Sequence, residues 1–159
     1  MLEHRAVLFL HWAGIRKRAN QYSVQAAIKR AKPGQPAYPD VLQGFDVLQA
    51  SNEVGAITLS EQYPQIDLIV CDIAVGTSSG TEIALKLRKA RPNLRVLFVS
   101  GTPMNAWEKR DMNNFLKLPV DSVDCLEKPF RPAAFLRKVK ELLTKRSQRL
   151  PGMTAGDAR

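Results

Sequence analysis

The chain has 159 residues, which is enough for one well-buried core, so a single domain is the natural expectation. Its hydrophobic content of 45% and charged content of 25% are ordinary for a globular protein. No apolar run approaches the roughly 20 residues that a membrane-spanning helix needs. The first apolar run, residues 6–10, is also too short for a signal peptide. We therefore expect a cytoplasmic protein with no membrane partner.

The net charge of +9 is concentrated towards the two ends of the chain. Residues 5–32 contain seven basic and no acidic side chains, and residues 131–149 contain seven basic side chains against Glu141 alone. Such a surplus either attracts nucleic acid or an acidic partner, or forms the solvated faces of amphipathic helices. No zinc finger or aromatic-studded basic strand accompanies it, so nucleic acid is not the expected partner.

The two cysteines, Cys71 and Cys125, each lie in a short apolar, strand-like run. Neither belongs to a CxxC motif, and neither has a histidine at metal-ligand spacing. We interpret both as small buried side chains and not as a zinc site.

The first third of the chain predicts two strands separated by a helix and a loop. The apolar run of residues 6–10 favours a strand that is buried on both faces. Apolar residues about one turn apart predict a helix over residues 15–26. Residues 32–40, with three prolines and a glycine, predict a loop, and residues 45–50 a second strand.

A second helix is expected after that strand, with Ser51 or Asn52 as its N-cap. Pro64 should end it, because proline disfavours helical geometry in the preceding residue, Tyr63. The apolar positions of this helix are Val54, Ile57 and Leu59.

The third strand covers residues 66–71 and places Asp72 at its carboxyl end. A loop over residues 76–80 follows, and then a helix that should end at Pro92. The apolar positions of that helix are Ile83, Leu87 and Ala90. Residues 94–99 predict the fourth strand, which Ser100 and Gly101 terminate.

The last part of the chain predicts two helices around one short strand. We expect a polar helix over residues 104–118 and a fifth strand over residues 125–127, followed by Lys128. A strong terminal helix is expected next, because its apolar residues recur at helical spacing. Its apolar positions are Phe135, Leu136, Val139, Leu142 and Leu143.

Regular alternation of strands and helices predicts a parallel sheet with helices on both faces. In such sheets, functional residues collect beyond the carboxyl ends of the strands, where Asp72, Ser100 and Lys128 each lie. A carboxylate can attack phosphorus, a lysine can neutralise phosphoryl oxygens, and a hydroxyl can donate a hydrogen bond to them. The three residues together therefore favour phosphoryl chemistry.

These residues resemble the signature sites of the response-regulator receiver domains of two-component signalling. Residues 66–73, with Gly80 eight positions after Asp72, are similar to the phosphoacceptor strand of that family. Ser100 and the segment Lys128-Pro129-Phe130 resemble its two other signature sites. The resemblance implies a flavodoxin-like α/β fold, a three-layer sandwich around a five-stranded parallel sheet. It also implies that a partner histidine kinase phosphorylates Asp72, that Ser100 and Lys128 contact the phosphoryl group, and that the Lys128–Pro129 bond is cis.

The resemblance covers roughly residues 6–143. We therefore expect one receiver-like domain over residues 5–145 and a disordered basic tail over residues 146–159.

The sequence departs from the family at the metal site. Receivers carry two acidic residues just after the first strand, whereas here no acid follows Leu10 before Asp40. Asp72 and the Ala74 carbonyl are then the evident ligands, a poor cage for Mg²⁺, so Mg²⁺ binding is in doubt. Asp72 could instead pair directly with Lys128.

Two further positions bear on the same question. His11 is open to two interpretations, a replacement ligand or, as we prefer, a structural side chain. Cys125 replaces the aromatic residue that usually reports phosphorylation in the family.

Three functions remain open. The first is a single-domain response regulator that accepts a phosphoryl group on Asp72 in a phosphorelay, with a histidine kinase or another signalling protein as partner. The second is a phosphorylation-independent pseudo-receiver that acts as a protein-interaction module. The third, nucleic-acid binding through the basic ends, has the least support. None of them is an enzyme acting on a small molecule. Assembly into a homodimer is left open.

Overall fold

The computed structural model describes residues 6–10, 45–75 and 77–144. Its centre is a five-stranded parallel sheet with the strand order β2-β1-β3-β6-β7. The strands are β1 (Ala6–Leu10), β2 (Asp46–Ala50), β3 (Ile66–Asp72), β6 (Arg95–Ser100) and β7 (Val123–Glu127). The predicted parallel α/β fold is thereby confirmed.

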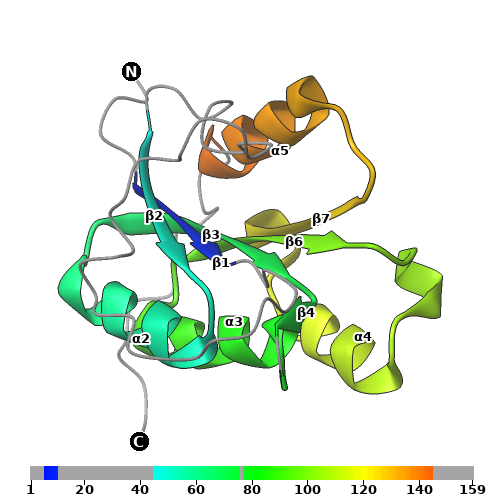
Figure 1. Ribbon diagram of the computed structural model, residues 1–159, viewed down its shortest axis with the longest axis horizontal. Coiled ribbons are helices and arrows are strands. Elements are labelled where there is room, and N and C mark those ends of the chain that lie inside the picture. The colour runs from blue at the N-terminus through cyan, green and yellow to red at the C-terminus, as the bar shows by residue number, and fades with distance from the viewer. Residues whose placement is uncertain (1–5, 11–44, 76, 145–159) are drawn as a thin grey trace, which may run out of the picture.

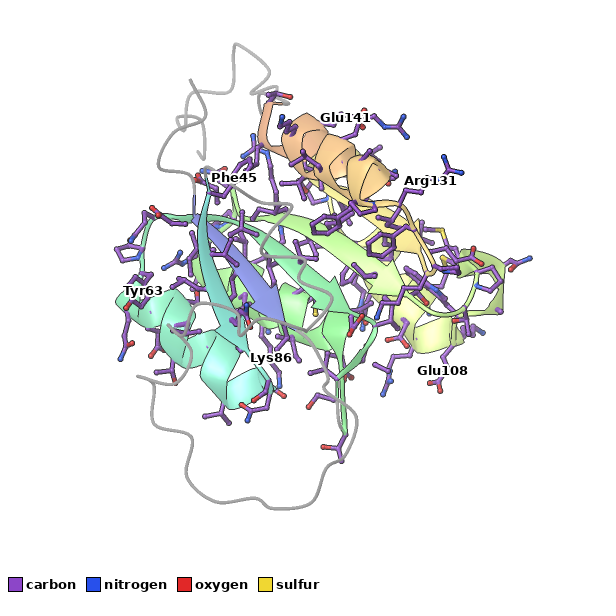
Figure 2. All side chains as sticks on the ribbon, turned by 45° about the horizontal axis from the view of Figure 1, so that its top comes forward. Phe45, Tyr63, Lys86, Glu108, Arg131 and Glu141 are labelled. Carbon is purple, nitrogen blue, oxygen red and sulfur yellow. The ribbon has the colours of Figure 1, made fainter. Side chains whose placement is uncertain are left out.

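Helices cover both faces of this sheet (Figure 1). Helix α5 (Pro132–Thr144) lies on one face, whereas α2 (Glu53–Gln62), α3 (Gly80–Ala90) and α4 (Lys109–Leu116) lie on the other. Figure 2 shows the same division at side-chain level, with Glu141 of α5 and Lys86 of α3 on opposite sides of the strands.

The two faces of the sheet carry separate hydrophobic cores. Alternate residues of the central strand β3 point to opposite faces, so that Ile69 joins the core under α2 and α3 while Val70 joins the core under α5. Both side chains are fully buried. The continuous apolar run in β3 is therefore what a strand covered on both faces requires.

The strand order places a topological switch between β1 and β3. Strand β1 pairs with β2 on one side and with β3 on the other, and all these pairings are parallel. The register of β3 with β6 puts Asp72 opposite Val99, next to Ser100, and β6 pairs Ser100 with Glu127 of β7. The carboxyl ends of β3, β6 and β7, where the sequence places Asp72, Ser100 and Lys128, therefore lie together at the carboxyl-terminal edge of the sheet.

Helix α2 has the termini that its sequence predicts. Asn52, one of the two candidate caps, accepts a hydrogen bond from the backbone N–H of Gly55 at 2.8 Å. The helix ends at Gln62, just before Tyr63 and Pro64. The Arg91 guanidinium then binds backbone carbonyls at this end, among them that of Tyr63 at 3.1 Å. A side chain from the end of α3 thus donates hydrogen bonds to carbonyls that have no donor within α2.

Two segments differ from their predictions. Residues 74–79, expected mainly as loop, contain a small antiparallel hairpin of β4 (Ala74–Val75) and β5 (Ser78–Ser79). The helix predicted over residues 104–118 is interrupted: a 3-10 turn, η2 (Met104–Ala106), precedes α4, and a second turn, η3 (Val120–Ser122), follows it. Tertiary contacts made by Trp107, described below, hold the chain extended between η2 and α4.

Two of the apolar helix positions named from the sequence lie at the surface. Val54 is 73% exposed in α2, where Ala56 and Leu59 face the sheet instead. Ala90, at the last position of α3, is also exposed. Both residues lie at helix ends, and spacing alone does not distinguish apolar positions that face the sheet from those at the ends of a helix.

Other predictions fall outside the described residues: the helix over 15–26, the loop over 32–40, His11, and the tail over 146–159. Among the helices that the structure describes, none is long and apolar enough to cross a membrane.

Candidate functional site

The candidate site begins with Asp72, the last residue of the buried strand β3. Its side chain is 13% exposed, so the carboxylate is largely enclosed but still reaches solvent. The Lys128 ammonium donates a hydrogen bond to Asp72 Oδ1 at 2.6 Å. The predicted direct pairing of these two residues, 56 positions apart in sequence, is therefore present.

Backbone hydrogen bonds hold the three strand ends together at this edge. The N–H of Ile73 donates to the Val99 carbonyl at 3.1 Å, and the N–H of Lys128 donates to the Ser100 carbonyl at 2.7 Å. The Lys128–Pro129 bond is cis, as the resemblance implied. Asp72, Ser100 and Lys128 are thus fixed on neighbouring elements by main-chain contacts, which is the rigidity that a reactive site needs.

The space behind Asp72 is filled by close packing of the next helix. The N–H of Gly80 donates to the Ile73 carbonyl at 2.7 Å. A Cβ atom on Gly80 would lie 1.9 Å from the Asp72 carbonyl oxygen and 2.7 Å from the Cys71 sulfur. Any side chain at position 80 would overlap the backbone of Asp72. This is why the residue eight positions after Asp72 must be glycine.

The Ser100 hydroxyl is buried and engaged with its own loop. It donates to the Thr102 carbonyl at 2.8 Å and accepts from the Thr102 backbone N–H at 3.1 Å. It also accepts from the indole N–H of Trp107 at 3.2 Å. Sequence reasoning missed Trp107 and Thr102, because both lie in a connection without periodic pattern. An aromatic residue in an otherwise polar segment was the available signal.

The described residues do not by themselves form a magnesium site. They contain no group of three or more His, Cys, Asp or Glu side chains that could hold a metal ion. One oxygen of Asp72 already accepts a hydrogen bond from the Lys128 ammonium. Ala74, the other predicted ligand, lies in β4 opposite Ser79. Mg²⁺ prefers several oxygen ligands in octahedral geometry, and this part of the chain does not supply them.

The two cysteines are free thiols, as expected. Cys71 is fully buried beside Asp72, and burial, followed by the nearby Asp72 charge, raises its pKa well above the ordinary value. Cys125 is half-buried in β7, and burial raises its pKa as well. Cys71 has no access to solvent, so it is a packing residue at this site.

Comparison with known proteins agrees with this geometry. Residues 40–140 match the response regulator receiver domain family. The sensor kinase CckA of Brucella abortus is 30% identical over 105 residues, which are 65% of this chain and 10% of that protein. The transcriptional regulatory protein CpxR homolog of Haemophilus influenzae is also 30% identical over 105 residues, covering 64% of this chain and 41% of that protein. The chain thus spans less than half of either relative.

Solved structures share the fold. A CheY-like receiver domain protein from Methanospirillum hungatei superposes with a TM-score of 0.61 at 21% identity, covering 87% of this chain and 93% of that one. A response regulator receiver protein from Sinorhizobium medicae gives 0.61 at 23% identity, with 90% and 97% covered. The expected flavodoxin-like receiver fold is therefore confirmed. With its family match and its strand-end Asp72, the chain belongs to the response regulator receiver domain family.

Proposed function

We propose that Asp72 accepts a phosphoryl group in a phosphorelay and that the chain signals through the resulting change at its surface. The observation that carries this proposal is the Asp72–Lys128 pair, with 2.6 Å between Oδ1 and Nζ, at the edge that Ser100 also occupies. Response regulator receiver domains are signalling modules, which fits this role.

The chemistry of the three side chains supports the proposal. An Asp72 carboxylate oxygen would form a bond to phosphorus while the bond from phosphorus to the donor's leaving atom breaks. With acetyl phosphate as donor, the products are an aspartyl phosphate and acetate. The Lys128 ammonium can neutralise the charge on the phosphoryl oxygens, and the Ser100 hydroxyl can donate a hydrogen bond to one of them.

The partner that supplies the phosphoryl group is proposed to be a histidine kinase or another signalling protein. Receiver domains interact with such proteins, and the family match supports the same class of partner here. A cytoplasmic location, single-domain organisation, the domain bounds 5–145 and assembly into a homodimer stay predictions.

Incubation with acetyl phosphate, with and without Mg²⁺, tests the phosphoacceptor role. Intact-mass measurement should show the mass of one added phosphoryl group on the wild-type chain and none on Asp72→Asn. Asp67→Asn is a matched control, because Asp67 lies in the same strand at its other end, and it should accept the group as the wild type does. Absence of the adduct from the wild type under both conditions would contradict the proposal.

A phosphorylation-independent interaction module is the second candidate function. It is favoured by the lack of a cluster of acidic metal ligands among the described residues. Receiver domains typically bind Mg²⁺ at such a pocket. Titration with Mg²⁺ and beryllofluoride, followed by tryptophan fluorescence, separates the candidates. Saturable quenching supports the phosphoacceptor, and an unchanged signal together with no adduct supports the interaction module.

A further inference from the structure

The Ser100 hydroxyl points into a small hydrogen-bonded turn in this structure. Its proton is donated to the Thr102 carbonyl, and its oxygen accepts from the Thr102 N–H and the Trp107 indole N–H and lies 3.2 Å from the Thr102 hydroxyl. A hydroxyl has one proton to donate. Ser100 must therefore release the Thr102 carbonyl before it can donate to a phosphoryl oxygen on Asp72.

Trp107 connects this hydroxyl to the hydrophobic core and to α4. Its indole N–H is shared between Ser100 Oγ and the Thr102 carbonyl, both at 3.2 Å. Its ring packs edge-on against Phe98 of β6 and against Phe115 of α4, with centroid distances of 6.3 and 5.7 Å. Edge-on aromatic contacts of this kind are directional, so the ring position and the hydrogen bond depend on one another.

Helix α4 itself is held to α3 by a separate set of contacts. Asp111 is 5% exposed and accepts hydrogen bonds from the hydroxyls of Ser79 and Thr81, the latter at 2.7 Å. The Asn114 amide donates to the Thr81 hydroxyl at 3.2 Å. A buried polar network that is fully satisfied holds its elements in one arrangement. None of these contacts involves Ser100 or Trp107.

The connection between β6 and α4 is therefore the segment that can respond to Ser100. It comprises residues 101–108, and in Figure 1 it leaves the end of β6 and turns back into α4. Most of its residues are exposed, and Trp107 is its main anchor to the core.

We propose that Trp107 transmits the phosphorylation state of Asp72 to this connection. The inference rests on the proposed function, because it requires a phosphoryl group on Asp72. When Ser100 turns to that group, the indole N–H loses one of its two acceptors and the 101–108 connection rearranges. Helix α4 stays attached to α3 through Asp111.

A purely structural role for Trp107 makes a different prediction. The Thr102 carbonyl alone would give the partly buried indole N–H an acceptor. In that case the environment of the indole would not depend on what Ser100 does. The indole N–H of the full-length chain is therefore the atom to observe.

The experiment records the indole N–H resonances of ¹⁵N-labelled protein before and after addition of acetyl phosphate, with the adduct quantified by intact mass. Trp107→Phe assigns the resonance, because the chain has two tryptophans. We expect the Trp107 resonance to shift and its solvent exchange to accelerate in proportion to the adduct. Ser100→Ala should shift it without acetyl phosphate. Backbone amides of α4 should keep their protection.

The rate of adduct formation provides a second readout. Trp107→Phe keeps an aromatic ring but removes one hydrogen bond that holds Ser100, so phosphorylation should be about two- to tenfold faster. Phe115→Leu removes one of the two ring contacts but keeps the indole N–H and the contact with Phe98, so its rate should rise less than that of Trp107→Phe.

The outcomes separate this inference from the proposed function. An adduct on Asp72 with an unmoved Trp107 resonance would overturn the inference alone. Equal acceleration by Phe115→Leu and Trp107→Phe would also overturn it, since packing would then be the cause. Failure to form any adduct would overturn the proposed function, and the inference with it.

Discussion

Asp72 derives its properties from its neighbours more than from its position in the sequence. Burial of the carboxylate at the end of β3 would be costly without a partner, and Lys128 provides that partner at 2.6 Å. The same ammonium can pair with the phosphoryl oxygens once Asp72 is phosphorylated. Lys128 is therefore the cation both in the resting pair and in the proposed phosphorylated state. In the resting state the Ser100 hydroxyl is hydrogen-bonded within its own turn.

Gly80 is the residue whose substitution should disturb this site most directly. In Gly80→Ala the added Cβ would overlap the Asp72 carbonyl oxygen at 1.9 Å, so the start of α3 and the end of β3 must move apart. We expect a loss of about 1–3 kcal/mol in the free energy of unfolding, measured by urea denaturation.

Gly101→Ala is the matched control for that substitution. A Cβ at Gly101 would meet no atom within 4 Å, so its stability should stay within about 0.5 kcal/mol of the wild type. Equal stability of the Gly80→Ala and Gly101→Ala variants would contradict the packing argument.

At the scale of elements, α4 differs from α3 and α5 in that its buried residues are polar, whereas theirs are mainly apolar. Its eight residues include Asp111 and Asn114 as its buried residues, both directed at the start of α3. A polar sequence at this point predicts a helix with little core contact. The structure instead uses a buried carboxylate to fix the helix, which periodicity of apolar residues cannot reveal.

Removal of the Asp111 carboxylate should therefore release α4 from α3. Asp111→Ala removes the carboxylate that accepts from both Ser79 and Thr81 and leaves these buried hydroxyls only each other as partners, at an expected cost of about 1–3 kcal/mol in unfolding free energy. Hydrogen exchange should show the greatest loss of protection in α4. Glu108→Gln, at the N-cap of α4 but with a side chain 77% exposed, should change both quantities much less. A similar effect of both substitutions would argue against the anchoring role of Asp111.

At the scale of the whole molecule, one charged cluster links three elements across the face opposite α5. Glu53 of α2 accepts hydrogen bonds from Lys86 of α3 and from Ser78 of β5, the latter at 2.9 Å. The hydrogen bond from Lys86 is the largest cause that lowers the pKa of Glu53 below its ordinary value of 4.5. The cluster therefore joins elements that are 25 to 33 residues apart in the chain.

This lowered pKa predicts a pH dependence of stability with a definite sign. Because the pKa of Glu53 is lower in the folded chain than in the unfolded chain, its stabilising contribution is complete above about pH 4.5. The contribution is lost as the pH falls through the folded pKa. The difference in unfolding free energy between wild type and Glu53→Gln should therefore be constant near neutral pH and shrink below pH 4.5. Solvent screens Lys86, whose side chain is 55% exposed, so the effect should be small.

Lys86→Gln provides the control, since it removes the main cause of the lowered pKa. In that background, Glu53→Gln should lose most of its pH-dependent effect. A difference that persists unchanged at low pH would show that Glu53 acts through packing and not through its charge.

The sequence by itself determined the sheet, because buried strands need continuous apolar runs and the residues that end them are polar, as at Asp72 and Ser100. It also determined the family, because the residues that carry the resemblance lie in short motifs, one at the end of each strand. The pairing of Asp72 with Lys128 was one of the possibilities that the sequence left open, and tertiary structure decided it. Tertiary structure alone decided the space that requires Gly80 and the hydrogen bond from Trp107 to Ser100. The physical reason is that each of these depends on atoms from segments distant in the chain, which local periodicity does not encode.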